Sequence, residues 1–192
     1  MGKGRLEAFS DGVIAILITI MVLELKVPEA GDVSDDLRHL APVFFSYLLS
    51  FVYLGIYWNN HHHMLHLADR VTGGILWANL HLLFWLSLVP FTTHWLAERH
   101  FASQPTAVYG LVFLFAGGAY QILQLRIIAA QGKGSRLRQA VGRDMKGKLS
   151  VGLYTVAVIL AFVNVPVSIA IYVLVALMWL IPDTRIEKVL RG

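Results

Sequence analysis

Long apolar stretches constrain this sequence more than any other feature. They recur at residues 12–23, 40–58, 75–97, 105–125, 149–165 and 166–182. A helix needs roughly 20 apolar residues to cross a bilayer, with a range of about 17–25. We therefore predict an all-α polytopic membrane protein, a single domain over residues 1–192. Its six predicted transmembrane helices lie at about 6–25, 38–66, 74–97, 104–131, 147–164 and 166–182.

The low share of charged residues agrees with this class. Charged residues make up 15% of the chain, whereas a soluble domain is about one quarter charged because polar groups cover its surface. The chain has no cysteine, which excludes disulfides, thiol catalysis and thiolate metal sites. Asn164-Val165-Pro166 is typical of a tight hairpin between the last two spans, since proline is tolerated in a first helical turn.

The basic residues indicate how the helices cross the membrane. With six spans, both termini share a side with the second and fourth loops. That side carries Lys3, Arg5, Arg70, Arg126, Lys133, Arg136, Arg138, Arg143, Lys146, Lys148, Arg185, Lys188 and Arg191. The opposite side carries Lys26, Arg38 and Arg99. Because basic loops stay in the cytoplasm, both termini are predicted to be cytoplasmic, and the basic charge needs no nucleic-acid partner.

Ionisable residues inside the spans are the candidates for function, because they are costly in lipid and usually face protein or water. They are Asp11, His61, His62, His63, His66, His81 and His94, with Arg5 and Glu7 just outside. The Asp11 carboxylate either caps the first helix or pairs with groups on neighbouring helices. We expect a polar network at the same depth that includes Trp58, His61, His62, Trp77, Asn79 and His81.

The histidines of the second span leave three interpretations open. His62 and His66 share a helical face at the spacing of two zinc ligands. No HExxH motif accompanies them, and no cysteine is present to complete a ligand set, so structural hydrogen bonding is favoured over metal binding. Proton sensing is the third interpretation, because histidine titrates near physiological pH.

Two features of the middle spans concern helix packing. Pro90 predicts a kink in the third span, where Ser87, Thr92 and Thr93 can bond to the freed backbone. Gly117-Gly118 in the fourth span predicts close contact with a neighbouring helix. Neither feature indicates a function by itself.

One motif in the first span is specific, Arg5-x-x-x-Phe9-Ser10-Asp11-Gly12 before an apolar helix. Supporting motifs are Trp58 with His61-His62, Asn79-Leu80, Leu88-Val89-Pro90-Phe91 and Pro182-Asp183-x-Arg185-Ile186-Glu187. Together these residues resemble the transmembrane protein 175 potassium-channel family, in its single-repeat prokaryotic form. The chain is richer in histidine than the family pattern, which leaves open which histidine pairs with the first motif.

The resemblance implies a homotetramer in a prokaryotic plasma membrane, with the first helix of each copy lining a central pore. It implies a channel for potassium and other monovalent cations that is weakly selective over sodium. It implies no enzymatic activity, no cofactor and no metal site. The TVGYG filter is absent from the sequence, so selectivity would come from the first helix.

The resemblance also implies roles for residues of the first helix. Ile16 would form a hydrophobic gate at the narrowest point. The other pore-lining positions would be Thr19, Ile20 and Leu23. The motif residues Arg5, Phe9, Ser10 and Asp11 would anchor the cytoplasmic half of this helix and so set the pore radius.

Helical geometry permits this assignment, because Ile16, Thr19, Ile20 and Leu23 share one face. The Thr19 hydroxyl would then replace part of a cation's hydration. Nearly all residues here are apolar, so periodicity alone does not select the face. Two other function classes stay open: a proton-coupled secondary transporter that uses Asp11 and the histidines of the second span, and an intramembrane metalloenzyme built on His61, His62, His63 and His66.

Overall fold

The computed structural model describes residues 2–25, 33–142 and 144–180, and the regular elements in these ranges are helices. They are α1 (Lys3–Val22), α2 (Val33–His66), α3 (Gly73–Ser87), α4 (Val89–Glu98), α5 (Ser103–Gln131), η1 (Gly132–Gly134), α6 (Arg136–Val141), α7 (Met145–Leu160) and α8 (Val165–Leu180). Lys26, Arg143 and residues 181–192, which hold the predicted motif at 182–187, lie outside the described residues.

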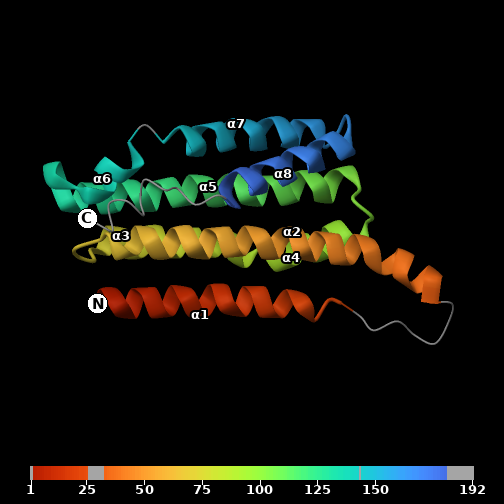
Figure 1. Cartoon of the computed structure of the whole chain (residues 1–192), viewed down its shortest axis with the longest axis horizontal. Coiled ribbons are helices and arrows are strands. Elements are labelled where there is room, and N and C mark those ends of the chain that lie inside the picture. Colours follow the sequence, from red (N-terminus) through yellow and green to blue (C-terminus); the bar gives the residue numbers. More distant parts are fainter. Residues whose placement is uncertain (1, 26–32, 143, 181–192) are drawn as a thin grey trace.

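The long helices run side by side along one axis of the molecule (Figure 1). α1 lies at one edge and α7 at the opposite edge. α1 packs against α2, α3 and α4, whereas α5 packs against α3, α4, α7 and α8. α1 therefore has its neighbours on one side, and its other side faces away from the bundle.

A group of aromatic rings fills the core between α2, α5, α7 and α8. The rings of Tyr53 and Phe113 stack with their centres 4.2 Å apart. Phe113 meets Tyr109 edge-on at 4.9 Å. The hydroxyl of the buried Tyr172 donates to the carbonyl of Thr106 at 3.1 Å. These side chains bury large apolar surfaces while their hydroxyl groups keep partners, as a buried tyrosine requires.

Three described helical segments are long and apolar enough to cross a membrane: Leu40–His66, Gly73–Glu98 and Ser103–Gln131. α7 and α8 have 16 residues each, fewer than a span normally needs. α1 has 20 residues but carries Arg5, Glu7 and Asp11 in its first half. The fold of the described residues is therefore that of an all-helical membrane protein.

The third predicted span is interrupted at Pro90. α3 ends at Ser87 and α4 begins at Val89, with Pro90 in the first turn, where its missing N–H costs nothing. The hydroxyls of Thr92 and Thr93 donate to carbonyls one turn earlier, at 3.2 and 2.7 Å. The Ser87 hydroxyl donates to a carbonyl in the last turn of α3 at 2.7 Å. The helix is thus interrupted where the kink was predicted, and the three hydroxyls bond to nearby carbonyls of Phe84, Leu88 and Val89.

Close helix packing occurs at Gly110 and not at the predicted glycine pair. A Cβ atom added at Gly110 would lie 1.9 Å from the hydroxyl oxygen of Tyr172. A Cβ at Gly117 would make an ordinary contact of 3.8 Å with the Tyr57 hydroxyl, and one at Gly118 would meet nothing within 4 Å. The predicted close contact at Gly117-Gly118 is therefore wrong within the described chain. The side chain that needs the space of a missing Cβ is Tyr172, and it lies opposite Gly110.

Gly110→Ala is expected to lower the free energy of unfolding by roughly 1–3 kcal/mol, because the new methyl group forces the fully buried Tyr172 ring to move. Thermal unfolding of the purified protein measures this loss. Gly118→Ala is the matched control on the same helix and should not lower the melting temperature, because its methyl group meets nothing and alanine favours a helix. Equal melting temperatures for both variants would contradict the packing at Gly110.

Candidate functional site

α1 has one buried face and one exposed face. Its buried residues are Leu6, Ser10, Ile14, Leu17 and Met21, spaced three or four positions apart. On the other side Ile16, Ile20 and Leu23 are 58%, 45% and 77% exposed, and Thr19 is exposed as well. The four residues predicted to line a pore thus lie together on the face that this chain leaves uncovered.

The Thr19 hydroxyl is held by its own helix. Its Oγ1 lies 3.1 Å from the carbonyl oxygen of Ala15 and 3.0 Å from that of Ile16. Because the hydroxyl proton points to these carbonyls, the oxygen presents its lone pairs outward. An outward oxygen lone pair on an otherwise apolar helix face can accept from water or take the place of a water ligand on a cation.

Ser10, Asn79 and His61 form a buried chain of hydrogen bonds that joins α1, α3 and α2. The Asn79 Nδ2 donates to the Ser10 Oγ at 2.9 Å, and the Asn79 Oδ1 lies 2.7 Å from the His61 Nε2. An amide oxygen only accepts, so in this arrangement the His61 Nε2 carries a proton. The three side chains are 0%, 0% and 1% exposed, so a lost bond leaves a buried polar atom unpaired.

Asp11 connects to α2 by a second route. The Trp58 Nε1 donates to the Asp11 Oδ1 at 3.0 Å. The His62 ring stacks on Trp58 with centres 6.3 Å apart and on His66 at 6.2 Å. His61 thus reaches the motif through Asn79, and His62 reaches it through Trp58. In the part of the chain that the structure describes, no three histidine or carboxylate side chains are arranged to hold a metal ion.

Four of the predicted site residues lie outside this network. Arg5 and Phe9 are exposed, on the same side of α1 as Ile16. Trp77 is 75% exposed. His81 accepts a hydrogen bond from the Trp85 Nε1 at 3.0 Å, within α3. Within this chain, therefore, the anchoring part of the motif is Ser10 and Asp11.

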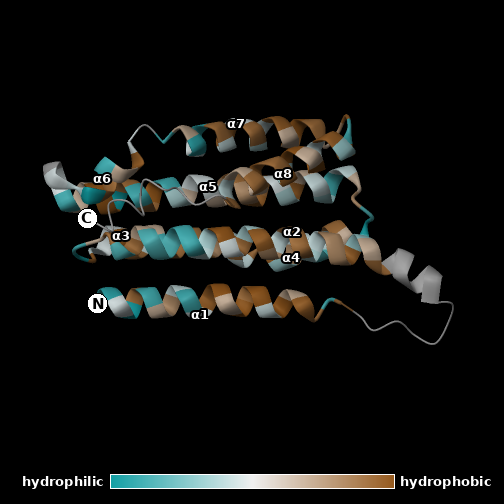
Figure 2. Cartoon of the chain, in the orientation of Figure 1, coloured by the Kyte–Doolittle hydropathy of each residue, from teal (hydrophilic) through white to brown (hydrophobic). Residues whose placement is uncertain are grey.

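The polar groups gather at one end of α1. Figure 2 shows hydrophilic residues in the N-terminal half of α1 and in the adjacent turns of α2 and α3, while the second half of α1 is hydrophobic. Here the Glu7 Oε1 and the His61 Nδ1 are buried and have no hydrogen-bond partner among the described atoms. Buried polar atoms are rarely left without a hydrogen-bond partner in folded proteins. Glu7 lies one turn before Asp11 in the sequence, and this spacing is the signal that places it on the same side of α1.

A second polar cluster, which the sequence analysis missed, joins α2, α4 and α5. The Ser50 Oγ lies 2.7 Å from the Thr93 Oγ1 and 3.0 Å from the Tyr109 hydroxyl. All three side chains are buried. Hydroxyl residues inside apolar stretches are common in membrane helices, so only their meeting in space distinguishes these three.

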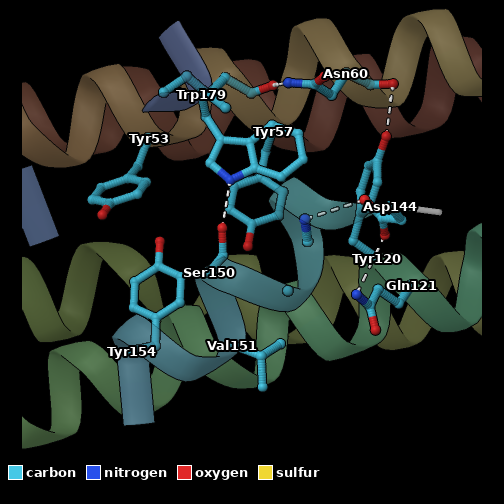
Figure 3. Close-up of a pocket in the computed structure, with 13 residues that line it drawn as sticks. Tyr53, Tyr57, Asn60, Tyr120, Gln121, Asp144, Ser150, Val151, Tyr154 and Trp179 are labelled. Atoms are coloured by element: carbon cyan, nitrogen blue, oxygen red, sulfur yellow. Dashed lines mark hydrogen bonds between the residues drawn. The ribbon is translucent and has the colours of Figure 1, made fainter. Parts of the chain in front are cut away.

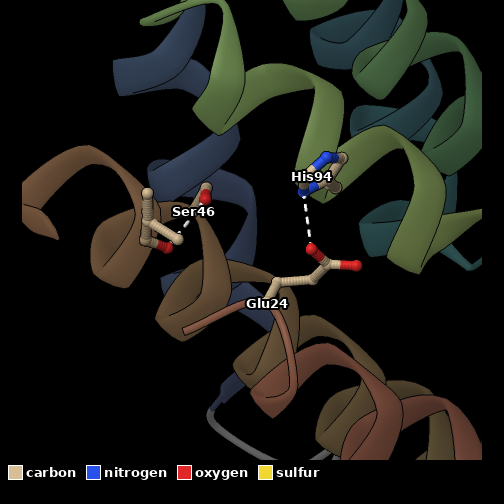
Figure 4. A network of polar contacts seen from close by, with 4 residues as sticks. Glu24, Ser46 and His94 are labelled. Atoms are coloured by element: carbon tan, nitrogen blue, oxygen red, sulfur yellow. Dashed lines mark hydrogen bonds and ion pairs between the residues drawn. The ribbon is translucent and has the colours of Figure 1, made fainter. Parts of the chain in front are cut away.

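The far end of α1 is tied to α4 (Figure 4). The His94 Nδ1 lies 2.8 Å from the Glu24 Oε2, and the two side chains are 45% and 44% exposed. Ser46, in the same view, donates to the Val43 carbonyl at 2.9 Å. A contact between side chains this exposed contributes at most about 1 kcal/mol, even when the imidazole is charged. It nevertheless holds a carboxylate directly after Leu23, at the end of the uncovered face.

Comparisons with known proteins identify relatives of this chain. A family model described as "Endosomal/lysosomal potassium channel TMEM175" matches residues 5–90, which include α2, α3 and all of α1 except its first two residues. A protein of Chryseobacterium sp. (strain P1-3), named a potassium channel, is 52% identical over 191 residues, which span 100% of this chain and 99% of that protein.

A solved structure and an animal protein are also similar. The crystal structure of a lysosomal potassium-selective channel TMEM175 homolog from Chamaesiphon minutus superposes with a TM-score of 0.82 at 31% identity, covering 94% of this chain and 97% of that one. The human endosomal/lysosomal proton channel TMEM175 is 37% identical over 87 residues, which are 38% of this chain and 17% of the human protein.

Proposed function

The chain belongs to the TMEM175 potassium-channel family, whose members are channels and not enzymes, and we propose that four copies of it surround a pore lined by α1. The uncovered face of α1 is the observation that carries this proposal. α1 packs on its own bundle through one side and carries four charged residues in its first half, Lys3, Arg5, Glu7 and Asp11. Such a helix is poorly suited to contact lipid, so its outer side needs water or further protein.

The proposed gate is a ring of four Ile16 side chains. Ile16 and Ile20 form an apolar section of the uncovered face, with the Thr19 oxygen between them. An apolar ring of this kind blocks ions by excluding water. Potassium sheds its hydration more readily than sodium, so a constriction without carbonyl ligands favours potassium weakly.

The proposed topology has six spans, formed by α1, α2, α3 with α4, α5, α7 and α8, and both termini in the cytoplasm of a prokaryotic cell. Two contacts support a topology in which the basic residues gather at one end of the bundle. Lys3 donates to the carbonyl of His66, and Arg70 donates to that of Ala130 at 2.8 Å. The loops after α2 and α5 therefore lie beside the N-terminus. Basic residues on one end of a membrane bundle favour the cytoplasmic side.

The proposal is tested by recording from the purified protein in planar bilayers under a potassium–sodium gradient, with native mass spectrometry of the same sample. We expect unitary ohmic currents, a reversal potential shifted modestly toward the potassium equilibrium value, and a mass of four chains. A different stoichiometry would contradict the pore. Flux without unitary currents would contradict a channel.

Asp11→Ala is expected to lower the free energy of unfolding by about 1–2 kcal/mol and so to weaken the tetramer. The substitution removes the hydrogen bond that the Trp58 indole donates to the Asp11 carboxylate. Thermal unfolding and the tetramer fraction measure this loss, while the reversal potential should remain that of the wild type. Asp11→Asn keeps an acceptor for Trp58 and should recover most of the stability. Loss of selectivity in a stable Asp11→Ala tetramer would contradict an anchoring role.

A proton-coupled transporter is the second candidate function. Two titratable side chains support it, since His61 and Glu7 each hold a buried atom without a hydrogen-bond partner among the described atoms. Transport by this route requires potassium flux to depend on a proton gradient. Flux assays in vesicles with and without an imposed pH gradient separate the two candidates, since a passive pore conducts potassium equally well in both.

A further inference from the structure

A pocket remote from α1 lies between α2, α5, α7 and α8 (Figure 3). Its empty volume is about 560 Å³, including the part that is open to the outside. Five of its thirteen lining residues are aromatic: Tyr53, Tyr57, Tyr120, Tyr154 and Trp179. Since the described lining residues come from helices other than α1, this pocket is distinct from the proposed pore.

Of the described residues that line the pocket, Asp144 alone has a side chain that carries a formal charge. It caps α7, with its Oδ1 accepting from the Gly147 amide at 3.1 Å. Its Oδ2 accepts a long hydrogen bond of 3.4 Å from the Gln121 side chain. A carboxylate offers about four lone-pair positions, so these two bonds leave it able to bind a further partner.

Hydrogen-bond donors of the pocket wall are engaged by the protein. Tyr53 and Tyr120 donate their hydroxyl protons to backbone carbonyls. The Trp179 Nε1 donates to the Ser150 Oγ at 2.7 Å, and Ser150 donates to a carbonyl one turn earlier at 2.9 Å. These groups therefore present ring faces and oxygen lone pairs to the pocket. Both are negative, so the wall attracts a cation and repels an anion.

The Trp179 ring already stabilises an ammonium group. The Lys146 Nζ lies 5.8 Å from the centre of this ring, within the range of a cation–π interaction. Lys146 is not among the residues that line the pocket, so this contact shows that the ring attracts an ammonium group while the pocket itself stays open.

We propose that this pocket binds a small alkylated ammonium ion, with its charge between the Asp144 carboxylate and the rings of Tyr57 and Trp179. A carboxylate beside several aromatic faces is the arrangement that recognises alkylated ammonium groups. A hydrated metal ion fits less well, because ring faces do not replace its oxygen ligands. The alkyl groups lie against the apolar parts of the tyrosine rings. This site is independent of the proposed pore.

Titration of the purified full-length protein with choline chloride tests the site, against sodium chloride at equal ionic strength. Tryptophan fluorescence and the melting temperature report binding. We expect a saturable change in the wild type and at least tenfold weaker affinity in Asp144→Asn, because asparagine keeps the helix cap but removes the charge. Glu98→Gln, which neutralises an exposed carboxylate at the end of α4, should bind as the wild type does.

A second pair of variants keeps the test independent of Asp144. Tyr57→Leu removes a ring face and should weaken choline affinity at least fivefold, whereas Tyr57→Phe keeps the face and should not. The uncharged isostere 3,3-dimethylbutan-1-ol should not saturate the site. The proposal is overturned if this alcohol binds as tightly as choline, if the wild type shows no saturable change, or if neither Asp144→Asn nor Tyr57→Leu weakens binding.

Discussion

Replacing Ile16 with asparagine is expected to raise potassium flux on the order of tenfold, equivalent to a barrier lower by ~1.4 kcal/mol. Ile16 is 58% exposed on the uncovered face of α1. In the proposed tetramer four such side chains make a dry ring that an ion crosses only after losing water. An amide at this position offers an oxygen acceptor and N–H donors to water, which wets the ring. Single-channel conductance and vesicle flux at equal protein density measure the change.

Two variants control for this result. Ile16→Val keeps an apolar ring and should stay within about twofold of the wild-type flux, because the barrier depends on the absence of polar groups. Ile159→Asn introduces the same amide on α7, at the opposite edge of the molecule, where the side chain is 62% exposed. It should leave the flux unchanged. Equal increases from Ile16→Asn and Ile159→Asn would indicate a leak and contradict the gate.

Asn79→Leu is expected to lower the free energy of unfolding by roughly 2–4 kcal/mol, the largest loss of stability among the substitutions considered. The leucine removes the acceptor of the His61 Nε2 and the donor to Ser10. His61 is 1% exposed, and its Nδ1 already has no partner among the described atoms. Both ring nitrogens would then be buried and unpaired. Thermal or denaturant unfolding in detergent measures the loss.

A double-mutant cycle separates this hydrogen bond from simple packing. Replacing both partners with apolar groups of similar shape removes the unpaired atoms, so His61→Phe combined with Asn79→Leu should be more stable than Asn79→Leu alone. Losses that simply add in the double variant would show that the two side chains act independently. That result would contradict the network that joins α2 and α3.

The break at Pro90 was predictable from the sequence, whereas the close contact at Gly110 was not. Proline lacks an N–H and fixes its own backbone angle, so its effect is local to the chain. A glycine matters only when a particular side chain lies opposite it, and Tyr172 comes from α8, far along the sequence. The same reasoning explains why Ser50, Thr93 and Tyr109 went unrecognised, since they meet only after three helices have packed.

The residues of the candidate site were also predictable only in part from the sequence. The sequence singled out Ser10, Asp11, Trp58, His61 and Asn79, because polar groups in an apolar span need partners nearby. It did not distinguish His61 from His62, and it grouped Arg5 and Phe9 with the anchors. Which imidazole reaches Asn79, and which motif residues stay exposed, depends on how α1 and α2 are rotated about their axes.

The sequence by itself determined that the chain is a helical membrane protein, because runs of apolar residues leave the backbone no water to bond and so require helices. It also indicated the end of the first helix where the polar residues meet. Only the tertiary structure decided which face of α1 stays uncovered. Almost every side chain from Gly12 to Leu23 is apolar, so hydrophobicity is similar all round the helix, and packing against α2, α3 and α4 selects the face that remains.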